Sequence, residues 1–175
     1  MTSAQISVAA VVAVLAFWVV GAYNRLVGLR SALIERFAAV DTVLRQRQRL
    51  FEKQIDLLAA ALANAGPRVD ALRAACRQAD AARAHAQSRP GAAGAVTSLR
   101  VAEEILADAR ARLPVQAIAG SDLPELNARI AEADAALAFA RREFNAAVAA
   151  YNEAVRQSPT ILVARLFGLR PAASF

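Results

Sequence analysis

The sequence contains 175 residues, which leaves room for one ordinary domain beside a membrane anchor. Its hydrophobic share of 57% rests largely on alanine, and glycine and proline are few, so helix is favoured almost throughout and an all-α protein is expected. The net charge of +6 comes nearly all from arginines that alternate with acidic residues and lack an aromatic stacking motif, which argues against a nucleic-acid partner.

A short N-terminal tail, residues 1–5, precedes an uncharged apolar run at residues 6–22. About 17 to 20 helical residues cross a hydrocarbon core of ~30 Å, so the run predicts a transmembrane anchor. Trp18 and Tyr23 lie at its far end, where amphipathic rings favour the headgroup zone. Because the tail carries no positive charge and no small-residue cleavage site follows, an uncleaved anchor is favoured over the alternative of a signal peptide.

The distribution of arginine around this run predicts its orientation. No Lys or Arg precedes it, whereas Arg25, Arg30 and Arg36 follow closely. The positive-inside rule then places the N-terminus outside and the body in the cytoplasm, with the chain as a single-pass protein of the inner membrane. A translocated body is the alternative.

Beyond the anchor, apolar periodicity predicts four helices, at residues 23–64, 67–87, 95–113 and 122–157. The first continues the transmembrane helix without a break. The fourth has the clearest pattern, with apolar residues that advance by three or four positions from Leu126 to Val155. Asp122 with Glu125 resembles a capping box at its start. Short connections favour antiparallel neighbours, so residues 23–157 are expected to form an elongated antiparallel four-helix bundle.

The C-terminal residues 158–175 contain an apolar segment. The first helix extends ~60 Å beyond Tyr23, and the fourth returns through ~50 Å, so the chain comes back close to the level of Tyr23. Residues 158–175 are therefore expected near the membrane, either as an interfacial helix or as a cap on the bundle. The candidate membrane-interface residues are Trp18, Tyr23, Arg25, Arg30, Ile161, Leu162, Arg165, Leu166 and Phe167.

Two sets of segments carry a family signature. The first is residues 23–27, Val40-Asp41 and the basic run 45–50, and the second is residues 140–145, Tyr151-Asn152, Ser158-Pro159, Ala164 and residues 166–168. In this order they resemble the LemA family of bacterial membrane proteins. The resemblance implies a single-pass anchor, a long-helix bundle and no known enzyme activity. After the basic run this chain has Phe51-Glu52-Lys53-Gln54 where the family usually has an Ile-Pro-Asn-like stretch, which indicates a divergent member.

Aromatic–asparagine pairs are the most specific local feature. They occur at Tyr23-Asn24, and one heptad apart on the fourth helix. On one interpretation the rings are core residues and the asparagines bond to a neighbouring helix. On the other, they belong to a partner-binding face where two helices leave apolar side chains uncovered. The candidate interaction or packing residues are Tyr23, Asn24, Leu33, Val40, Leu44, Phe144, Asn145, Tyr151 and Asn152.

The sequence offers little material for catalysis. His85 is the single histidine and has no ligand-spaced partner, Glu103 and Glu104 point to different sides of a helix, and no glycine-rich phosphate loop is present. No catalytic residue, cofactor, metal or small-molecule substrate is expected.

A membrane-anchored scaffold or adaptor is therefore the predicted function. It would present a helical bundle to a protein partner or to another copy of itself. The alternative is an accessory or sensor component of an envelope signalling or stress system, which would transmit helix shifts through the anchor.

Overall fold

The computed structural model describes residues 3–61, 66–113 and 122–175 and is helical in each of these ranges. The helices are α1 (Ser3–Ala61), α2 (Gly66–Ser88), α3 (Ala93–Ala111), α4 (Leu123–Arg156) and α5 (Thr160–Leu166). The predicted all-α class is confirmed. α2, α3 and α4 begin and end within two residues of their predicted bounds. The predicted end of the first helix, at residue 64, lies outside the described residues.

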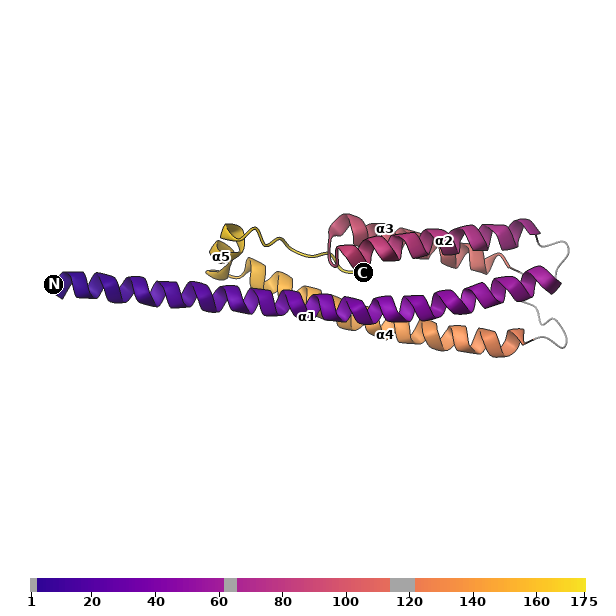
Figure 1. Ribbon diagram of the computed structural model, residues 1–175, viewed down its shortest axis with the longest axis horizontal. Helices are drawn as coiled ribbons and strands as arrows, with labels where there is room; N and C mark the ends of the chain where they lie inside the picture. The colour runs from indigo at the N-terminus through magenta and orange to yellow at the C-terminus, as the bar shows by residue number, and fades with distance from the viewer. Residues whose placement is uncertain (1–2, 62–65, 114–121) are drawn as a thin grey trace.

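α1 is a single helix of 59 residues, about 90 Å long at 1.5 Å per residue. α4 lies along its second half and runs in the opposite direction, and α2 and α3 form a hairpin on the same half (Figure 1). The first part of α1 extends alone beyond the other helices (Figure 1). Residues 7–22 of this part are called the arm below, and the rest of the described chain is called the body.

Two buried clusters hold the body together. One contains the α1 residues from Leu26 to Leu44 with their partners on α4 and α5 and around the α2–α3 turn. The other contains the α1 residues from Leu50 to Leu58 with their partners on α2, α3 and α4. All nine residues of the predicted stripe on α4 are buried: Leu126, Ile130, Ala133, Leu137, Ala140, Phe144, Val148, Tyr151 and Val155. Periodicity therefore identified the face that α4 turns to the core.

Two local features of the sequence can be compared with the helices, the start of α4 and the missing family proline in α1. Asp122 occupies the N-cap position of α4, but its side chain makes no capping hydrogen bond. Its ψ of 7° lies far from the extended conformation that aims an N-cap side chain at the first turn, so the predicted capping box does not form. α1 also runs without a break through Phe51 and Gln54, where the family proline is missing, and both side chains are buried.

The turn between α2 and α3 depends on a glycine. Gly91 has a φ of +78°, and a Cβ atom at this position would lie 2.9 Å from the Cβ of Ala172 and 3.3 Å from Cδ2 of Leu33. Glycine supplies both the left-handed backbone and the space for this close approach. The turn thus reaches α1 at Leu33 and meets the C-terminal residues there.

Candidate functional site

The arm is apolar, and it is uncovered except at its base, where Val19 and Ala22 pack against the body. Its side chains are exposed at Val8, Val11, Val12, Val14, Leu15, Phe17 and Val20. Within the described residues α1 is the one helix that is long and apolar enough to cross a membrane, and its most apolar stretch has no buried residue. The core helix of a soluble protein would be covered by other parts of the protein. The exposed arm does not have this property. A signal sequence near the N-terminus meets the same criteria of length and composition.

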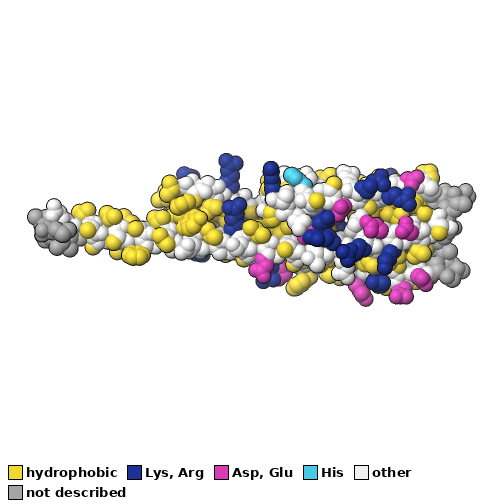
Figure 2. All heavy atoms as spheres, in the orientation of Figure 1, with side chains coloured by type: hydrophobic (Ala, Val, Ile, Leu, Met, Phe, Trp, Pro, Cys, Tyr) yellow, Lys and Arg dark blue, Asp and Glu magenta, His cyan; other side chains and the backbone are white. Residues whose placement is uncertain are grey.

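α5 lies beside the base of the arm, as the helix lengths predict. The rings of Tyr23 and Phe167 have centroids 4.6 Å apart, and Arg25 Nη1 lies 3.5 Å from Gln157 Oε1 at the end of α4. Val163 and Ala164 are buried against the body, whereas Leu162 and Leu166 are 64% and 75% exposed. α5 therefore has an apolar face on each side. Its outer face and the arm form one apolar region at the end of the molecule that Figure 2 shows with few charges.

The other candidate membrane-interface residues lie around this region. Trp18 and Phe167 are partly exposed, Ile161 is half-buried, and Arg25, Arg30 and Arg165 are exposed. We call this end of the body, formed by the base of the arm, the end of α4 and α5, the proximal end.

The candidate interaction residues divide into two groups. Leu33, Val40, Leu44, Phe144 and Tyr151 are each at most 4% exposed, and the rings of Phe37 and Phe144 pack edge to face with centroids 5.3 Å apart. Tyr23 and Asn24 are exposed. The predicted uncovered apolar face of α1 and α4 does not exist, because the α2–α3 turn and the C-terminal residues cover it. Core packing is the role that the structure gives the first group.

Asn145 and Asn152 hold the C-terminal residues. The Asn145 side chain donates to the Phe175 carbonyl oxygen at 2.7 Å and accepts from its N–H at 2.8 Å. Asn152 makes the same pair of bonds with Ala172, at 2.8 and 2.7 Å. The asparagines thus bind backbone of the chain terminus and not a neighbouring helix, which corrects the first interpretation above.

Residues 169–175, called the tail below, run from α5 back along the body to the α2–α3 turn (Figure 1). The Ala173 N–H donates to the Gly91 carbonyl oxygen at 2.8 Å, and Phe175 is 6% exposed. The sequence placed all of residues 158–175 at the membrane. In the structure only the α5 part lies at the proximal end, because the asparagines two helical turns apart bind the tail against the middle of the body.

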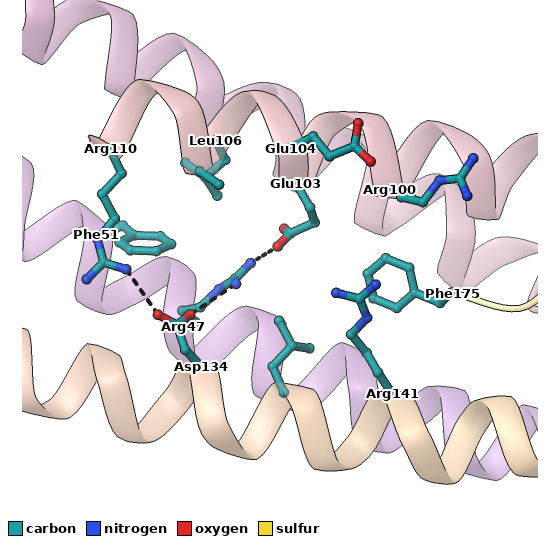
Figure 3. A pocket seen from close by; sticks show the side chains of 12 residues that line it. Arg47, Phe51, Arg100, Glu103, Glu104, Leu106, Arg110, Asp134, Arg141 and Phe175 are labelled. Atoms are coloured by element: carbon teal, nitrogen blue, oxygen red, sulfur yellow. Dashed lines mark hydrogen bonds and ion pairs between the residues drawn. The ribbon is translucent and has the colours of Figure 1, made fainter. Parts of the chain in front are cut away.

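A charged cavity of about 440 Å³ lies next to the end of the tail (Figure 3). Arg47 from α1 pairs with Glu103 from α3 and with Asp134 from α4, and Arg110 Nη1 lies 3.0 Å from Asp134 Oδ2. The guanidinium groups of Arg47 and Arg110 also lie 5.4 and 5.3 Å from the Phe51 ring. These contacts join α1, α3 and α4. The charged groups that line one side of the cavity are therefore paired with one another.

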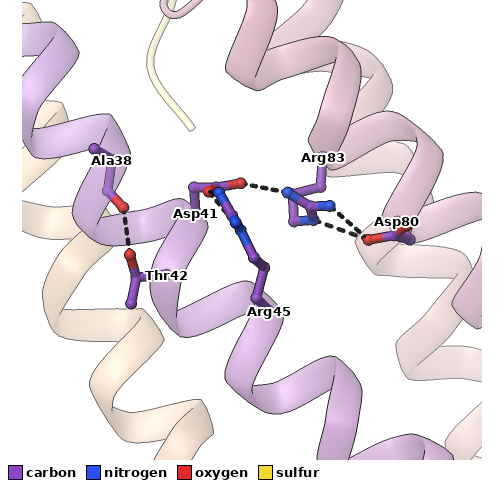
Figure 4. A network of polar contacts seen from close by, with 6 residues as sticks. All are labelled: Ala38, Asp41, Thr42, Arg45, Asp80 and Arg83. Carbon is purple, nitrogen blue, oxygen red and sulfur yellow. Dashed lines mark hydrogen bonds and ion pairs between the residues drawn. The ribbon is translucent and has the colours of Figure 1, made fainter.

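A second ion-pair network joins α1 to α2 (Figure 4). Asp41 is 2% exposed and accepts from Arg45 Nε at 2.8 Å and from Arg83 Nη1 at 2.6 Å. Arg83 also pairs with Asp80 at 2.8 Å. Burial lowers the pKa of Arg83, but the hydrogen bonds to Asp41 and Asp80 outweigh it and leave this pKa above its usual value. The charge of Arg83 is therefore kept at every accessible pH.

The described part of the chain contains neither a metal-binding cluster nor a reactive thiol. No group of three or more His, Cys, Asp or Glu side chains there could hold a metal ion. Burial, with a smaller contribution from the nearby negative charge of Glu52, raises the pKa of Cys76 to about 11, so the thiol is protonated at neutral pH.

Two comparisons with known proteins bear on this architecture. A family model described as LemA family matches residues 36–175, which make up most of the chain. The matched region begins after the arm. The search of curated proteins finds no match.

Proposed function

This chain belongs to the LemA family, and we propose that it is a membrane-anchored helical scaffold without enzymatic activity. In this proposal the arm is a transmembrane helix, and α1 carries it without interruption into a four-helix bundle formed by α1 to α4. The carrying observation is the arm itself: an apolar helical stretch that is exposed along most of its length and continuous with a packed body. Exposed apolar surface of this extent requires a lipid or protein environment.

The proximal end supports the same proposal. The exposed apolar side chains of α5 continue the apolar surface of the arm past Tyr23, and the arginines nearest to them are exposed. Apolar residues beside arginines suit the boundary between hydrocarbon and headgroups. α5 would then lie in the interface and fix the angle between the body and the membrane.

We further propose that the protein lies in the inner membrane with its N-terminus outside and its body in the cytoplasm. Arg25, Arg30 and Arg36 follow the arm, and they would stay on the cytoplasmic side. A fusion of alkaline phosphatase to the C-terminus is expected to be inactive in cells, and a fusion of green fluorescent protein is expected to fluoresce. Phosphatase activity of the C-terminal fusion would reverse the orientation.

The scaffold part of the proposal rests on how the polar residues of the body are used. The buried charges are committed to ion pairs between helices, and this favours a structural role for them over a catalytic one. Partner contacts belong on the body residues that remain exposed and apolar. They include Ile34 on α1, Val101 and Ile105 on α3, and Phe139 on α4, which is 59% exposed.

Site-specific photocrosslinking in native membranes tests the scaffold role. A photoreactive residue in place of Phe139 or Ile105 is expected to give an adduct with another protein or with a second copy of this chain. The matched control places the same residue at Glu125, which is exposed and polar. Recovery of the monomer alone from every position would contradict the proposal, and an adduct with a signalling protein would favour the accessory role.

A further inference from the structure

A second cavity, of about 570 Å³, opens where three separate segments meet beside Tyr151 of α4. α1 contributes Leu33 and Ile34, the α2–α3 turn contributes residues 89–93, and the tail with its preceding glycine contributes residues 168–172. The cavity therefore exists only while the tail is bound. Its apolar floor and its position close to the proximal end distinguish it from the ion-pair cavity of Figure 3.

The charge of this cavity is positive. Arg30, Arg89 and Arg170 line it, one from each segment, and no Asp or Glu is among its lining residues. Elsewhere in the body arginines pair with carboxylates, as Arg47 and Arg83 do. Within the described residues these three make no ion pair. Three unpaired guanidinium groups around one concave surface are a typical arrangement for binding an anion.

A largely buried tyrosine and a helix end also face this cavity. Tyr151 lines it, is 3% exposed, and makes no hydrogen bond to a residue that the structure describes. Burial raises the pKa of Tyr151, against the opposing charge of Arg30, so the hydroxyl remains a donor at neutral pH.

Ala92 and Ala93 also line the cavity, at the N-terminus of α3. The N-cap residue there supplies no side-chain hydrogen bond, and the first turn has no acidic residue. The free N–H groups and the positive end of the helix dipole at this terminus add to the attraction for an anion.

We propose that this cavity binds a phosphate group, held by Arg30, Arg89 and Arg170 and by the Tyr151 hydroxyl. Phosphate presents several acceptor oxygens, which matches donors that converge from three directions, and guanidinium groups bind it through two N–H donors each. The remaining volume and the apolar floor suit a small glycerol-like substituent.

Two sources of phosphate fit this chemistry, a lipid headgroup and a small soluble phosphate. Arg30 lies about 12 Å along α1 from Ala22, the last residue of the arm. The polar layer of a bilayer is about 5–8 Å thick on each side, and an arginine side chain reaches most of the remaining distance. The phosphate site goes beyond the scaffold proposal and does not depend on it, because binding can be measured without a membrane.

Calorimetric titration of the full chain in a phosphate-free non-ionic detergent tests the site. The probes are dihexanoyl phosphatidylglycerol and inorganic phosphate. The triple variant R30Q/R89Q/R170Q is expected to bind about 100-fold more weakly than the unchanged chain, or about fivefold per arginine. Y151F removes one hydrogen bond and leaves every charge in place, and it is expected to weaken binding about fivefold.

The matched control is R49Q/R129Q/R142Q, which removes the same charge from exposed arginines elsewhere. It is expected to bind like the unchanged chain. Binding of the lipid alone identifies a headgroup as the source, and equal binding of inorganic phosphate identifies a soluble ligand. Either result supports the site. The proposal is overturned if neither probe binds, if both triple variants lose affinity equally, or if Y151F binds unchanged.

Discussion

Replacement of Asp41 by asparagine is expected to lower the free energy of unfolding by about 3 kcal/mol. The carboxylate is buried and accepts hydrogen bonds from two guanidinium groups, one on its own helix and one on α2. Asparagine keeps the size of the side chain, but it removes the charge and turns an N–H donor towards a cation. The loss is at the low end of the ~3–5 kcal/mol for a broken buried ion pair, because Arg83 retains Asp80 and Arg45 is half exposed.

Urea unfolding of the full chain in detergent, followed by circular dichroism, measures this loss. The control is D80N, which removes the half-exposed partner of the same arginine and is expected to cost at most about 1 kcal/mol. A double-mutant cycle of D41N with R83Q isolates the pair, and the double variant should lose little more than D41N alone. An equal loss in D41N and D80N, or an absence of coupling in the cycle, would refute the assignment of Asp41.

The residues that suggested the family also turn out to hold the helices together. Val40-Asp41 places a core residue next to the carboxylate that ties α1 to α2. Phe144-Asn145 and Tyr151-Asn152 each place a buried ring next to an amide that binds the tail. In each pair the first residue faces the core and the second holds a further segment. This arrangement explains how short, separated motifs can specify one architecture.

Helix positions and buried faces could be predicted because they follow from local periodicity. On α1, Phe37, Phe51 and Leu58 recur at multiples of seven residues and are buried, and the predicted stripe on α4 is buried as well. Helix lengths alone placed the end of α4 beside Arg25. The burial of Arg47 is different. It lies in a run of alternating arginines, and only the approach of Glu103 and Asp134 from two other helices distinguishes it from its exposed neighbours.

The tail could not be predicted from its sequence. It has no helical or strand periodicity, and it is held through its backbone, so its side chains carry little information about where it binds. The same gap left open the interpretation that Leu33 and Val40 belong to an uncovered partner-binding face, whereas both are buried. The anion cavity was missed for a related reason, since its three arginines are far apart in the sequence and meet only after the tail has docked.

The double variant N145A/N152A is expected to release the tail while the helices stay folded. Each asparagine exchanges two hydrogen bonds with one tail residue, so the double variant loses four bonds at about 1 kcal/mol each. The two asparagines are about 10 Å apart along α4, which matches the span of the three extended steps from Ala172 to Phe175. Alanine cannot make these hydrogen bonds, and the released Phe175 would also lose its contact with Arg141.

Hydrogen exchange resolved by peptide fragment measures the release. The Ala172 and Phe175 amides are expected to exchange at least about 100-fold faster in the double variant, whereas amides within α4 keep most of their protection. N24A is the matched control, because Asn24 is exposed and makes no hydrogen bond to a residue that the structure describes, and it should leave exchange unchanged. G91A is expected to disturb the contact between the tail and the α2–α3 turn, since its Cβ would lie 2.9 Å from that of Ala172. Tail amides that stay protected in both N145A/N152A and G91A would show that other contacts hold the tail, and the anion cavity would then not depend on these asparagines.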